Sequence, residues 1–400
     1  MTYKELENIK DESVFIFGAG LIGRTFAYDM VSLSGHIVEG YFDNKIPDGT
    51  IVDTGKKDIK VFSLDYLYRE KNKIRLFLAV GDKNQKEIIK KFKKYGIEDY
   101  IVIDFFALQE FAESVLASGD EGVIERYKVI VDDAEYLKRQ YKVRLGERLN
   151  LEHPRGFNEK IQWLKLHDRQ PGYVQLVDKY AVKELISKTI GEKYVVPTLG
   201  VWNHFDDIDF ETLPNEFVLK CTHDSGSVVV VKDKKNMDKE TVKEKLERAL
   251  SKNWYWGARE WPYKNVTPRI MAEKYLKSNG YDNLIVYKFM CFNGVPKIIQ
   301  VIQDDKTKEE SIDYFDVKWN LLDMRQGFPN SKKHLSKPHS LSQMIKLAAD
   351  LSKGIRFVRV DFFEVDNSPV FSEFTFYSDA GFSEFKPKCW GQVLGDYISI

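Results

Sequence analysis

The feature of this sequence that most constrains its fold is a glycine-rich segment between a predicted strand and a predicted helix. Ser13–Phe17 is an apolar run typical of a buried strand, and Gly18-Ala19-Gly20-Leu21-Ile22-Gly23 follows it directly. In such a segment the first glycine permits a tight turn, the second lets the backbone approach a phosphate, and the third allows close packing of helix on strand. A helix from about Ile22 would then offer unpaired N–H groups to an anion.

Strands and helices continue to alternate after this segment. His36–Phe42, Arg75–Val80 and Tyr100–Asp104 have the pattern of further strands, and residues 83–95 form a lysine-rich amphipathic helix. Such alternation is typical of a parallel, doubly wound sheet. We therefore expect an α/β, Rossmann-like domain over residues 1–105.

The candidate ligand-binding residues of this domain are Gly18, Gly20, Gly23 and Asp43. Asp43 ends the second predicted strand, where an acidic residue about 20 positions after the glycines usually meets a ribose hydroxyl. The alternative is a Rossmann-like scaffold that binds nothing, or that only docks on its neighbour.

The rest of the chain changes character twice, as its 400 residues allow for two or three domains. Helical periodicity runs through residues 134–144 and resumes over Phe157–Leu166, which predicts a helical connector over residues 106–170. Residues 171–400 mix both patterns and predict an α+β domain. Its predicted strands include residues 217–220, 228–231, 285–290 and 357–362, and its predicted helices are residues 177–188, 239–252 and 341–353.

Charge and cysteine content exclude several classes of protein. The 61 basic and 61 acidic side chains give no net charge, which disfavours a sequence-independent nucleic-acid binder. Three scattered cysteines form neither a disulfide framework nor a metal motif, and they suggest reduced thiols in the cytoplasm. The N-terminus has no signal-peptide core and no apolar run could span a bilayer, so we expect no transmembrane segment.

The C-terminal half contains cationic and small polar residues in the order that a triphosphate site requires. Lys179 follows Asp178 at the start of a predicted helix, and Lys220 ends a predicted strand. The next residues, Cys221–Ser227, form a small polar loop whose Ser225 and Gly226 can fold their N–H groups over phosphates. A lone lysine such as Lys220 is more often a solvated surface charge, so the order of the pieces is the stronger evidence.

Acidic residues follow on two later strands. Arg359 and Asp361 are two positions apart on one strand and therefore share a face. Glu373 lies on the next strand, and with Asp361 it could bind one or two magnesium ions. Both carboxylates could instead be exposed on the sheet, but their apolar flanks argue against this because a lone buried charge is costly.

Residues from about 134 to 400 resemble the TupA-like branch of the ATP-grasp family, which occurs in surface-polysaccharide gene clusters. The resemblance is collinear and covers about two-thirds of the chain. It is carried by Phe157-Asn-Glu-Lys-Ile-Gln-Trp-Leu-Lys-Leu166, Asp178-Lys-Tyr-Ala-Val-Lys183, Val196-Pro-Thr-Leu-Gly-Val-Trp202, Phe217-Val-Leu-Lys-Cys-Thr-His-Asp-Ser-Gly226, Glu260-Trp-Pro-Tyr263, Phe357-Val-Arg-Val-Asp361 and Phe371-Ser-Glu-Phe-Thr375.

The resemblance implies an ATP-grasp fold for residues 171–400, with ATP and Mg2+ as cofactors. It implies that Lys179 and Lys220 contact the ATP phosphates, that Arg359 faces the transferred phosphoryl group, and that Asp361 and Glu373 bind magnesium. Residues that would line the adenine pocket are Glu273, Lys274, Tyr275 and Leu276. Lys288, on a strand after this hinge, either faces the nucleotide or points outward. Many family members carry Glu-x-Asn at the second metal site, whereas Thr375 stands here, which puts a second magnesium in doubt.

Residues 13–104 also resemble the nucleotide-sugar-binding N-terminal domain of sugar acyltransferases. The matching stretches are Phe15-Ile-Phe-Gly-Ala-Gly20, Gly40-Tyr-Phe-Asp-Asn44 and Ala79-Val-Gly-Asp82. This resemblance favours a nucleotide-sugar over a redox dinucleotide as the ligand of the glycine-rich segment.

Three functions follow as hypotheses. The first is an ATP-dependent ligase that joins a carboxylate, such as a uronic acid or amino acid, to an amine through an acyl-phosphate in capsular or other surface-polysaccharide biosynthesis. The second is a glycosyltransferase of the same biosynthesis, which would transfer sugar without ATP. The third is a nucleotide-binding regulatory protein, against which the retained Lys220, Arg359, Asp361 and Glu373 argue.

Overall fold

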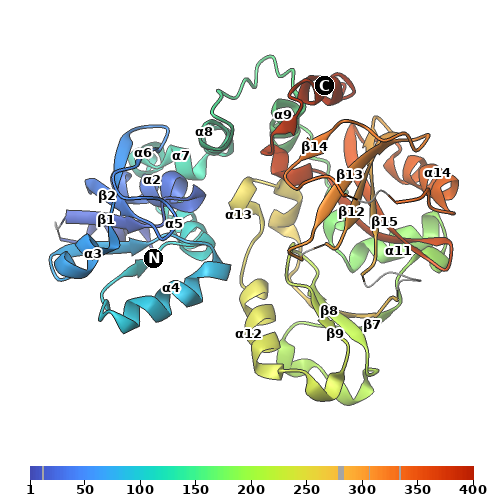
Figure 1. Ribbon diagram of the computed structural model, residues 1–400, viewed down its shortest axis with the longest axis horizontal. Coiled ribbons are helices and arrows are strands. Elements are labelled where there is room, and N and C mark those ends of the chain that lie inside the picture. Colours follow the sequence, from blue (N-terminus) through green and yellow to red (C-terminus); the bar gives the residue numbers. More distant parts are fainter. Residues whose placement is uncertain (11–12, 278–282, 306, 333–334) are drawn as a thin grey trace. The chain divides into compact units, whose positions relative to one another are not determined.

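The computed structural model describes residues 1–10, 13–277, 283–305, 307–332 and 335–400. It divides into two compact units, Met1–Leu149 and Asn150–Ile400 (Figure 1). No helix in these ranges is long and apolar enough to cross a membrane.

The first unit alternates strands and helices as its sequence pattern predicts. Its elements are α1 (Tyr3–Glu7), β1 (Ser13–Phe17), η1 (Gly23–Ala27), α2 (Tyr28–Leu33), β2 (Val38–Phe42), β3 (Ile51–Asp53), β4 (Asp58–Phe62), α3 (Leu64–Glu70), β5 (Ile74–Leu78), α4 (Asp82–Lys94), β6 (Ile101–Val102), α5 (Phe105–Ala117), α6 (Glu121–Arg126), α7 (Lys128–Val131) and α8 (Asp133–Leu145).

One six-stranded sheet, in the order β3-β4-β2-β1-β5-β6, forms the centre of this unit. The pairs of β1 with β2 and β5, of β2 with β4, and of β5 with β6 are all parallel. Only β3 runs antiparallel, in a hairpin with β4. The sheet is therefore mixed, with the parallel core that the sequence predicts; the pattern of the hairpin strands is too short and too charged to have predicted them.

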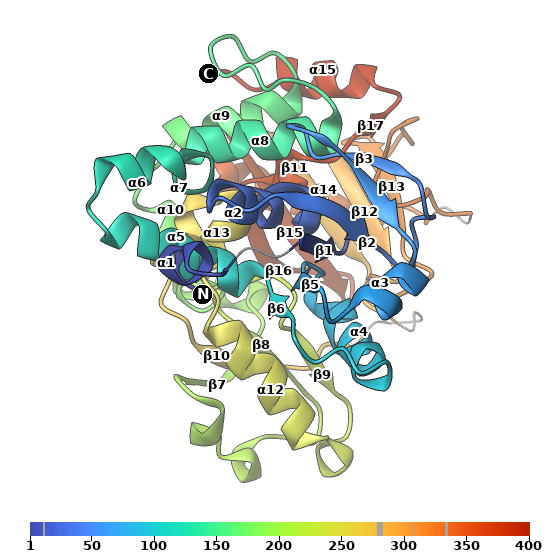
Figure 2. The same ribbon diagram turned by 90° about the vertical axis from the view of Figure 1, so that its left-hand side faces the viewer.

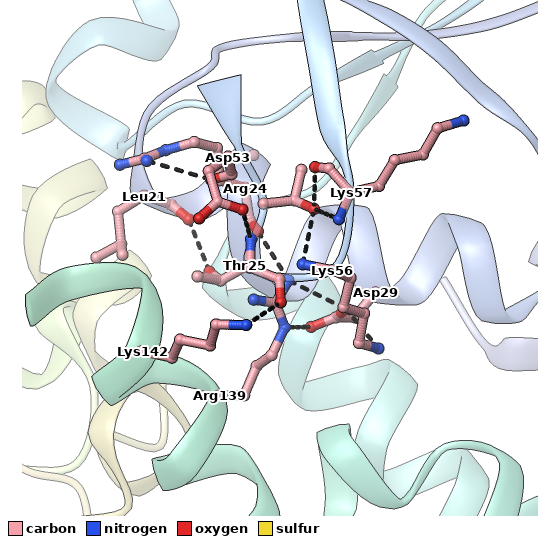
Figure 3. A network of polar contacts seen from close by, with 12 residues as sticks. Leu21, Arg24, Thr25, Asp29, Asp53, Lys56, Lys57, Arg139 and Lys142 are labelled. Carbon is pink, nitrogen blue, oxygen red and sulfur yellow. Dashed lines mark hydrogen bonds and ion pairs between the residues drawn. The ribbon is translucent and has the colours of Figure 1, made fainter. Parts of the chain in front are cut away.

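Helix α8 belongs to the first unit, although the sequence places it in a connector. Arg139 on α8 donates to both carboxylate oxygens of the buried Asp29 on α2, at 2.9 and 3.3 Å, and to the carbonyl of Arg24 at 3.0 Å (Figure 3). Lys142, about one turn later on the same helix, donates to the carbonyl of Gly55 at 2.8 Å. Removing one partner of a charge pair that is this deeply buried costs several kcal/mol, so these contacts hold α8 on the compact unit Met1–Leu149.

The second unit contains a four-stranded sheet, a five-stranded sheet and the short two-stranded sheet β14-β17. Its main elements are α9 (Phe157–His167), α10 (Tyr173–Val177), α11 (Ala181–Thr189), β7 (Thr198–Trp202), β8 (Phe217–Cys221), β9 (Val229–Val231), α12 (Lys239–Leu250), α13 (Tyr255–Ala258), β10 (Ile270–Lys274), β11 (Val286–Phe292), β12 (Val295–Gln303), β13 (Ser311–Asp316), β14 (Arg325–Gln326), α14 (Leu341–Ser352), β15 (Phe357–Val365), β16 (Ser368–Thr375), η7 (Ser378–Gly381), β17 (Phe385–Lys386) and α15 (Cys389–Asp396). Its short 3-10 turns are η2 (Glu192–Tyr194), η3 (Phe205–Asp207), η4 (Phe210–Thr212), η5 (Lys234–Asn236) and η6 (Trp261–Asn265).

The smaller sheet has the order β7-β10-β8-β9 and is antiparallel at every pairing. Helix α12 covers one of its faces (Figures 1 and 2), and Val242 and Leu246 of the helix pack with Leu219 and Cys221 of β8. Because alternate residues of a strand face opposite sides, Lys220 points away from this core.

The larger sheet has the order β13-β12-β11-β15-β16, again antiparallel. Helix α14 packs on it through Leu341, Met344 and Ala348, which join the main hydrophobic core of the unit. Strands β12 and β13 are not predicted from the sequence, because their buried runs lack the alternation that marks a strand with one solvated face.

Candidate functional site

Three neighbouring strands of the larger sheet place charged residues side by side. In the strand register Lys288 of β11 lies opposite Asp361 of β15, and Asp361 lies opposite Glu373 of β16. Directly opposite residues of antiparallel strands have their side chains on the same face, close enough to interact. The predicted placement of Asp361 and Glu373 on adjacent strands is therefore confirmed, and Lys288 joins them.

Arg359 is buried beside this row and is held by several oxygens. Its Nε donates to Asp361 Oδ1 at 2.8 Å and its Nη2 to Asp361 Oδ2 at 2.9 Å, while Nη1 reaches Ser378 Oγ at 3.2 Å. Burial acts to lower the pKa of Arg359, but Asp361 and Glu373 outweigh it and raise the pKa above its usual value. The guanidinium is thus permanently charged and fixed in orientation.

Glu373 is the less occupied carboxylate of the pair. Its side chain is 37% exposed, against 1% for Asp361, and its nearest cation is Arg359 Nη2 at 3.9 Å. Desolvation acts to raise the pKa of Glu373, but the positive charges of Lys179, Lys288, Arg359 and Lys220 outweigh it and leave the pKa below its usual range. The positive charges of four residues from separate segments therefore act on one accessible carboxylate.

A second group of charges lies on the smaller sheet and the helix beside it. Glu273 of β10 is buried and pairs with Lys220 of β8 and with Lys183 of α11, the latter at 2.5 Å. Burial acts to raise the pKa of Glu273, but Lys220 and Lys183 lower it further than burial raises it. Lys183 Nζ also donates to the carbonyl of Val196 at 2.7 Å, and burial lowers its pKa.

Lys179 is held against the small polar loop between β8 and β9. Its ammonium donates to the carbonyl of Asp224, and its backbone N–H donates to the carbonyl of Thr222 at 3.0 Å. Burial lowers the pKa of Lys179, although Glu373 and Asp224 oppose the shift. Inside the loop Ser227 Oγ donates to Asp224 Oδ1 at 2.6 Å.

The tip of this loop is exposed at Ser225 and Gly226. Gly226 has a φ of 109°, a conformation that a side chain strongly disfavours. The loop is thus held at its base by Lys179 and exposed at its tip.

Two positions with predicted roles also have contacts within the protein. The predicted adenine-lining stretch begins with Glu273, whose carboxylate is occupied by Lys183 and Lys220. Lys274 ends β10, its N–H donates to the carbonyl of Pro197, and its side chain is exposed, while Tyr275 and Leu276 follow in an irregular segment and are half-buried. Thr375, the predicted weak metal ligand, accepts a hydrogen bond from Arg359 Nη2 at 2.9 Å.

Sequence reasoning missed Lys183 as part of this site. Its pairing with Glu273 joins a helix to a strand far along the chain, and no local spacing of residues predicts such a contact. The quoted stretch Asp178–Lys183 contains the residue, but Lys179 was the only lysine of it given a role.

The acidic pair has the kind of ligands that magnesium prefers. Mg2+ usually takes one or two carboxylates together with substrate phosphates and water rather than a full protein cage. Asp361 and Glu373 supply two such groups on one face, and the described residues contain no group of three or more acidic, histidine or cysteine ligands. The residues therefore fit an ion shared with a nucleotide, with Glu373 as the open ligand.

The three glycines of the glycine-rich segment differ in how much space surrounds them. A Cβ on Gly18 would lie 2.4 Å from the carbonyl of Ala79, and one on Gly23 would lie 1.8 Å from the carbonyl of Gly18. A Cβ on Gly20 would meet nothing within 4 Å. Gly18 and Gly23 are thus required by the fold, whereas Gly20 faces open space.

Asp43, which directly follows β2, contacts this segment and has three backbone partners. Its carboxylate accepts from the N–H of Ala19 at 3.0 Å, of Lys45 at 2.8 Å and of Ile46 at 3.3 Å. Asp43 therefore orders the glycine-rich turn directly. A ribose contact would have to share these oxygens.

A known protein family matches the sequence of the second unit. The TupA-like ATP-grasp family matches residues 159–399, which is more than half of the chain. No curated protein matches the sequence.

Several solved structures are similar at low identity. D-alanine–D-alanine ligase from Bacillus anthracis complexed with ATP is 13% identical over 97% of this chain and 96% of that chain, with a TM-score of 0.34. A RimK domain ATP-grasp protein from Sphaerobacter thermophilus is 14% identical over 58% and 70%, with a TM-score of 0.33. The ATP-grasp ligase PsnB complexed with minimal precursor, Mg and ADP is 10% identical over 92% and 90%, with a TM-score of 0.30. At these TM-scores the assignment rests on the family match.

Proposed function

The chain belongs to the TupA-like ATP-grasp family, and from this premise we propose that it is an ATP-dependent carboxylate–amine ligase that uses Mg2+. The observation that carries the proposal is the row of Lys288, Asp361 and Glu373 on three neighbouring strands, with the buried Arg359 paired to Asp361 beside it. A triphosphate with its metal ion needs this combination of fixed cations and paired carboxylates, because phosphoryl transfer is catalysed mainly by positioning and charge neutralisation.

In the proposed reaction a substrate carboxylate attacks the γ-phosphate of ATP, and an amine then displaces phosphate from the acyl-phosphate. Lys179 and Lys220 would hold the phosphates, with Ser225 and Gly226 of the loop covering them. Asp361 and Glu373 would hold magnesium, which neutralises phosphate charge. Arg359, fixed by Asp361 and Ser378, would stabilise the charge on the transferred phosphoryl group.

Glu273 has a supporting part in this proposal. It pairs with Lys183 and with Lys220 and so fixes the positions of both ammonium groups. The stretch Glu273–Leu276 remains the proposed wall of the adenine pocket, with Lys288 facing the nucleotide from β11.

The proposed substrates are a uronic acid or amino acid and an amine, in the biosynthesis of a capsular or other surface polysaccharide. This rests on the setting in which the resembled family occurs. We place the reaction in the cytoplasm, where ATP is available and the three free cysteines would stay reduced. The match to the TupA-like ATP-grasp family supports the ligase over a glycosyltransferase.

The proposal is tested by screening the purified chain for ADP release from MgATP. Panels of uronic acids, nucleotide-uronates and amino acids are supplied with and without a panel of amines. We expect ADP release that needs both a carboxylate and an amine, together with a product whose mass equals their sum less water. Sugar transfer from a nucleotide-sugar without ADP release would favour the glycosyltransferase instead.

The glycine-rich segment supports a second, separate binding function. The open space at Gly20 is where a diphosphate would approach, so we propose that the first unit binds a nucleotide-sugar through Gly18, Gly20, Gly23 and Asp43. The bound sugar would serve the ligase as its carboxylate partner or as a regulatory signal.

Gly20→Val is expected to abolish this binding without unfolding the chain. Gly20 has no left-handed φ and its Cβ direction is empty, so valine fits the fold but fills the place of the phosphate. Calorimetry on the full chain with UDP-, GDP- and CDP-sugars and with NAD measures the effect. Gly172→Val, at another open glycine in the second unit, is the control. Tight NAD binding would contradict the nucleotide-sugar proposal, and no binding by the unaltered chain would leave a scaffold.

A further inference from the structure

A fully buried lysine on α9 is hydrogen-bonded to the end of α13 and to η7, the turn that follows β16. Lys165 has no exposed surface, and its Nζ donates to Gln162 Oε1 at 2.9 Å, to the carbonyl of Ala258 at 2.9 Å and to the carbonyl of Ala380 at 2.8 Å. An ammonium has three protons to donate, and these acceptors can take all three. The ring of Phe382 lies 4.7 Å from the same nitrogen.

The turn η7 (Ser378–Gly381) has a strained backbone. Asp379 and Ala380 have φ values of 48° and 51°, and Gly381 follows with 67°. Left-handed backbone costs a non-glycine residue on the order of 1–2 kcal/mol, so two in succession persist only where the surroundings enforce them.

The enforcing contacts come from α9. Gln162, also without exposed surface, donates to the carbonyls of Ala380 at 3.0 Å and Gly381 at 2.8 Å. Lys165, three residues later on the same helix, donates to the carbonyl of Ala380 as well. Gln162 therefore holds the carbonyls of both Ala380 and Gly381, and Lys165 holds that of Ala380.

The turn begins with a residue that touches the site. Ser378 is buried, and its Oγ accepts a hydrogen bond from Arg359 Nη1 at 3.2 Å. The remaining nitrogens of Arg359 are fixed by Asp361 and Thr375, so Ser378 is the partner that a movement of the turn would remove.

We infer that Lys165 is a positioning residue: by holding the turn Ser378–Gly381 in its left-handed form, it sets Ser378 on Arg359 and so aims the guanidinium at the γ-phosphate. This inference rests on the proposed ATP-dependent function. It gives an internal helix lysine, which makes no contact with the phosphates in the proposal, a part in γ-phosphate recognition.

The test compares the affinities of the full-length chain for ADP and for AMP-PNP, each with Mg2+, by calorimetry. AMP-PNP carries a γ-phosphoryl group and ADP does not, so the ratio of the two reports the contact of Arg359. Lys165→Met is expected to reduce the AMP-PNP preference about tenfold, the usual worth of one charge-assisted hydrogen bond, with ADP affinity unchanged. Ser378→Ala should cause the same loss, and the double variant should lose no more than either, because both act through one contact.

A rescue separates positioning from general stability. Glycine adopts the left-handed region without steric cost, so adding Ala380→Gly to Lys165→Met should restore part of the preference. Lys160→Met, which removes an α9 lysine that donates to the carbonyl of Ile398, should leave the ratio unchanged.

Two outcomes overturn the inference and differ in what else they overturn. If the unaltered chain binds both nucleotides and Ser378→Ala keeps its preference for AMP-PNP, the inference alone is wrong, and this holds even where Lys165→Met fails to fold. If the unaltered chain binds neither nucleotide, the proposed function is wrong and the inference falls with it.

Discussion

Glu373→Gln is expected to abolish ATP-dependent turnover while the chain stays folded. The substitution keeps the size of the side chain but removes the negative charge on which the positive charges of Lys179, Lys288 and Arg359 act, and it removes the open ligand of the proposed metal pair. We expect a loss of about a hundredfold at the least, the scale of losing one electrostatic contact in a transition state. The rate of ADP release and a thermal melt of the same sample measure both parts.

Asp361→Asn should lose turnover as well, but with a different cost to stability. Asp361 is the buried partner of Arg359, and removing one member of a buried pair costs about 3–5 kcal/mol. Asp366→Asn, in the turn of the same β15–β16 hairpin, is the control, since asparagine tolerates its left-handed φ of 50°. Near-normal turnover in both Glu373→Gln and Asp361→Asn would remove the acidic pair from the site.

Lys220→Ala is expected to lower the rate of turnover by roughly a hundredfold or more. One phosphate contact is worth on the order of 2–4 kcal/mol in the transition state, and each 1.4 kcal/mol is a factor of ten. The loss should extend beyond the lysine, because Glu273 would keep only Lys183 as its cation. Steady-state rates and ATP affinity are compared with those of Lys232→Ala, an exposed lysine just after β9. An unchanged rate with unchanged ATP affinity would refute the role of Lys220.

Local patterns predicted much of the fold and the acidic half of the site. The glycine-rich turn and its flanking strands gave a parallel sheet, and the spacing of Arg359, Asp361 and Glu373 placed them together on adjacent strands. These predictions succeed because strand alternation and the length of a hairpin are local properties of the sequence.

The remaining features depend on contacts between distant segments. A lysine within a helix usually indicates a solvated face, so neither the burial of Lys165 nor the ion pair of the half-buried Lys183 could be recognised. Arg139 also lies within a helix, and the sequence gives no sign that it is buried. Its pairing with Asp29 nevertheless holds α8 on the first unit. The β3–β4 hairpin was missed because its strands are short and charged, while β12 and β13 were missed because they are buried on both faces.

The most direct test of the ligase follows the oxygen atoms of the substrate carboxylate. Once the screen has identified a carboxylate and an amine, the carboxylate is labelled with 18O and turned over with MgATP, and the released phosphate is analysed by mass spectrometry. Attack by the carboxylate on the γ-phosphate, followed by displacement by the amine, predicts one 18O atom in each phosphate and ADP as the other product. Phosphate without label, or AMP and pyrophosphate in place of ADP and phosphate, would contradict an acyl-phosphate ligase.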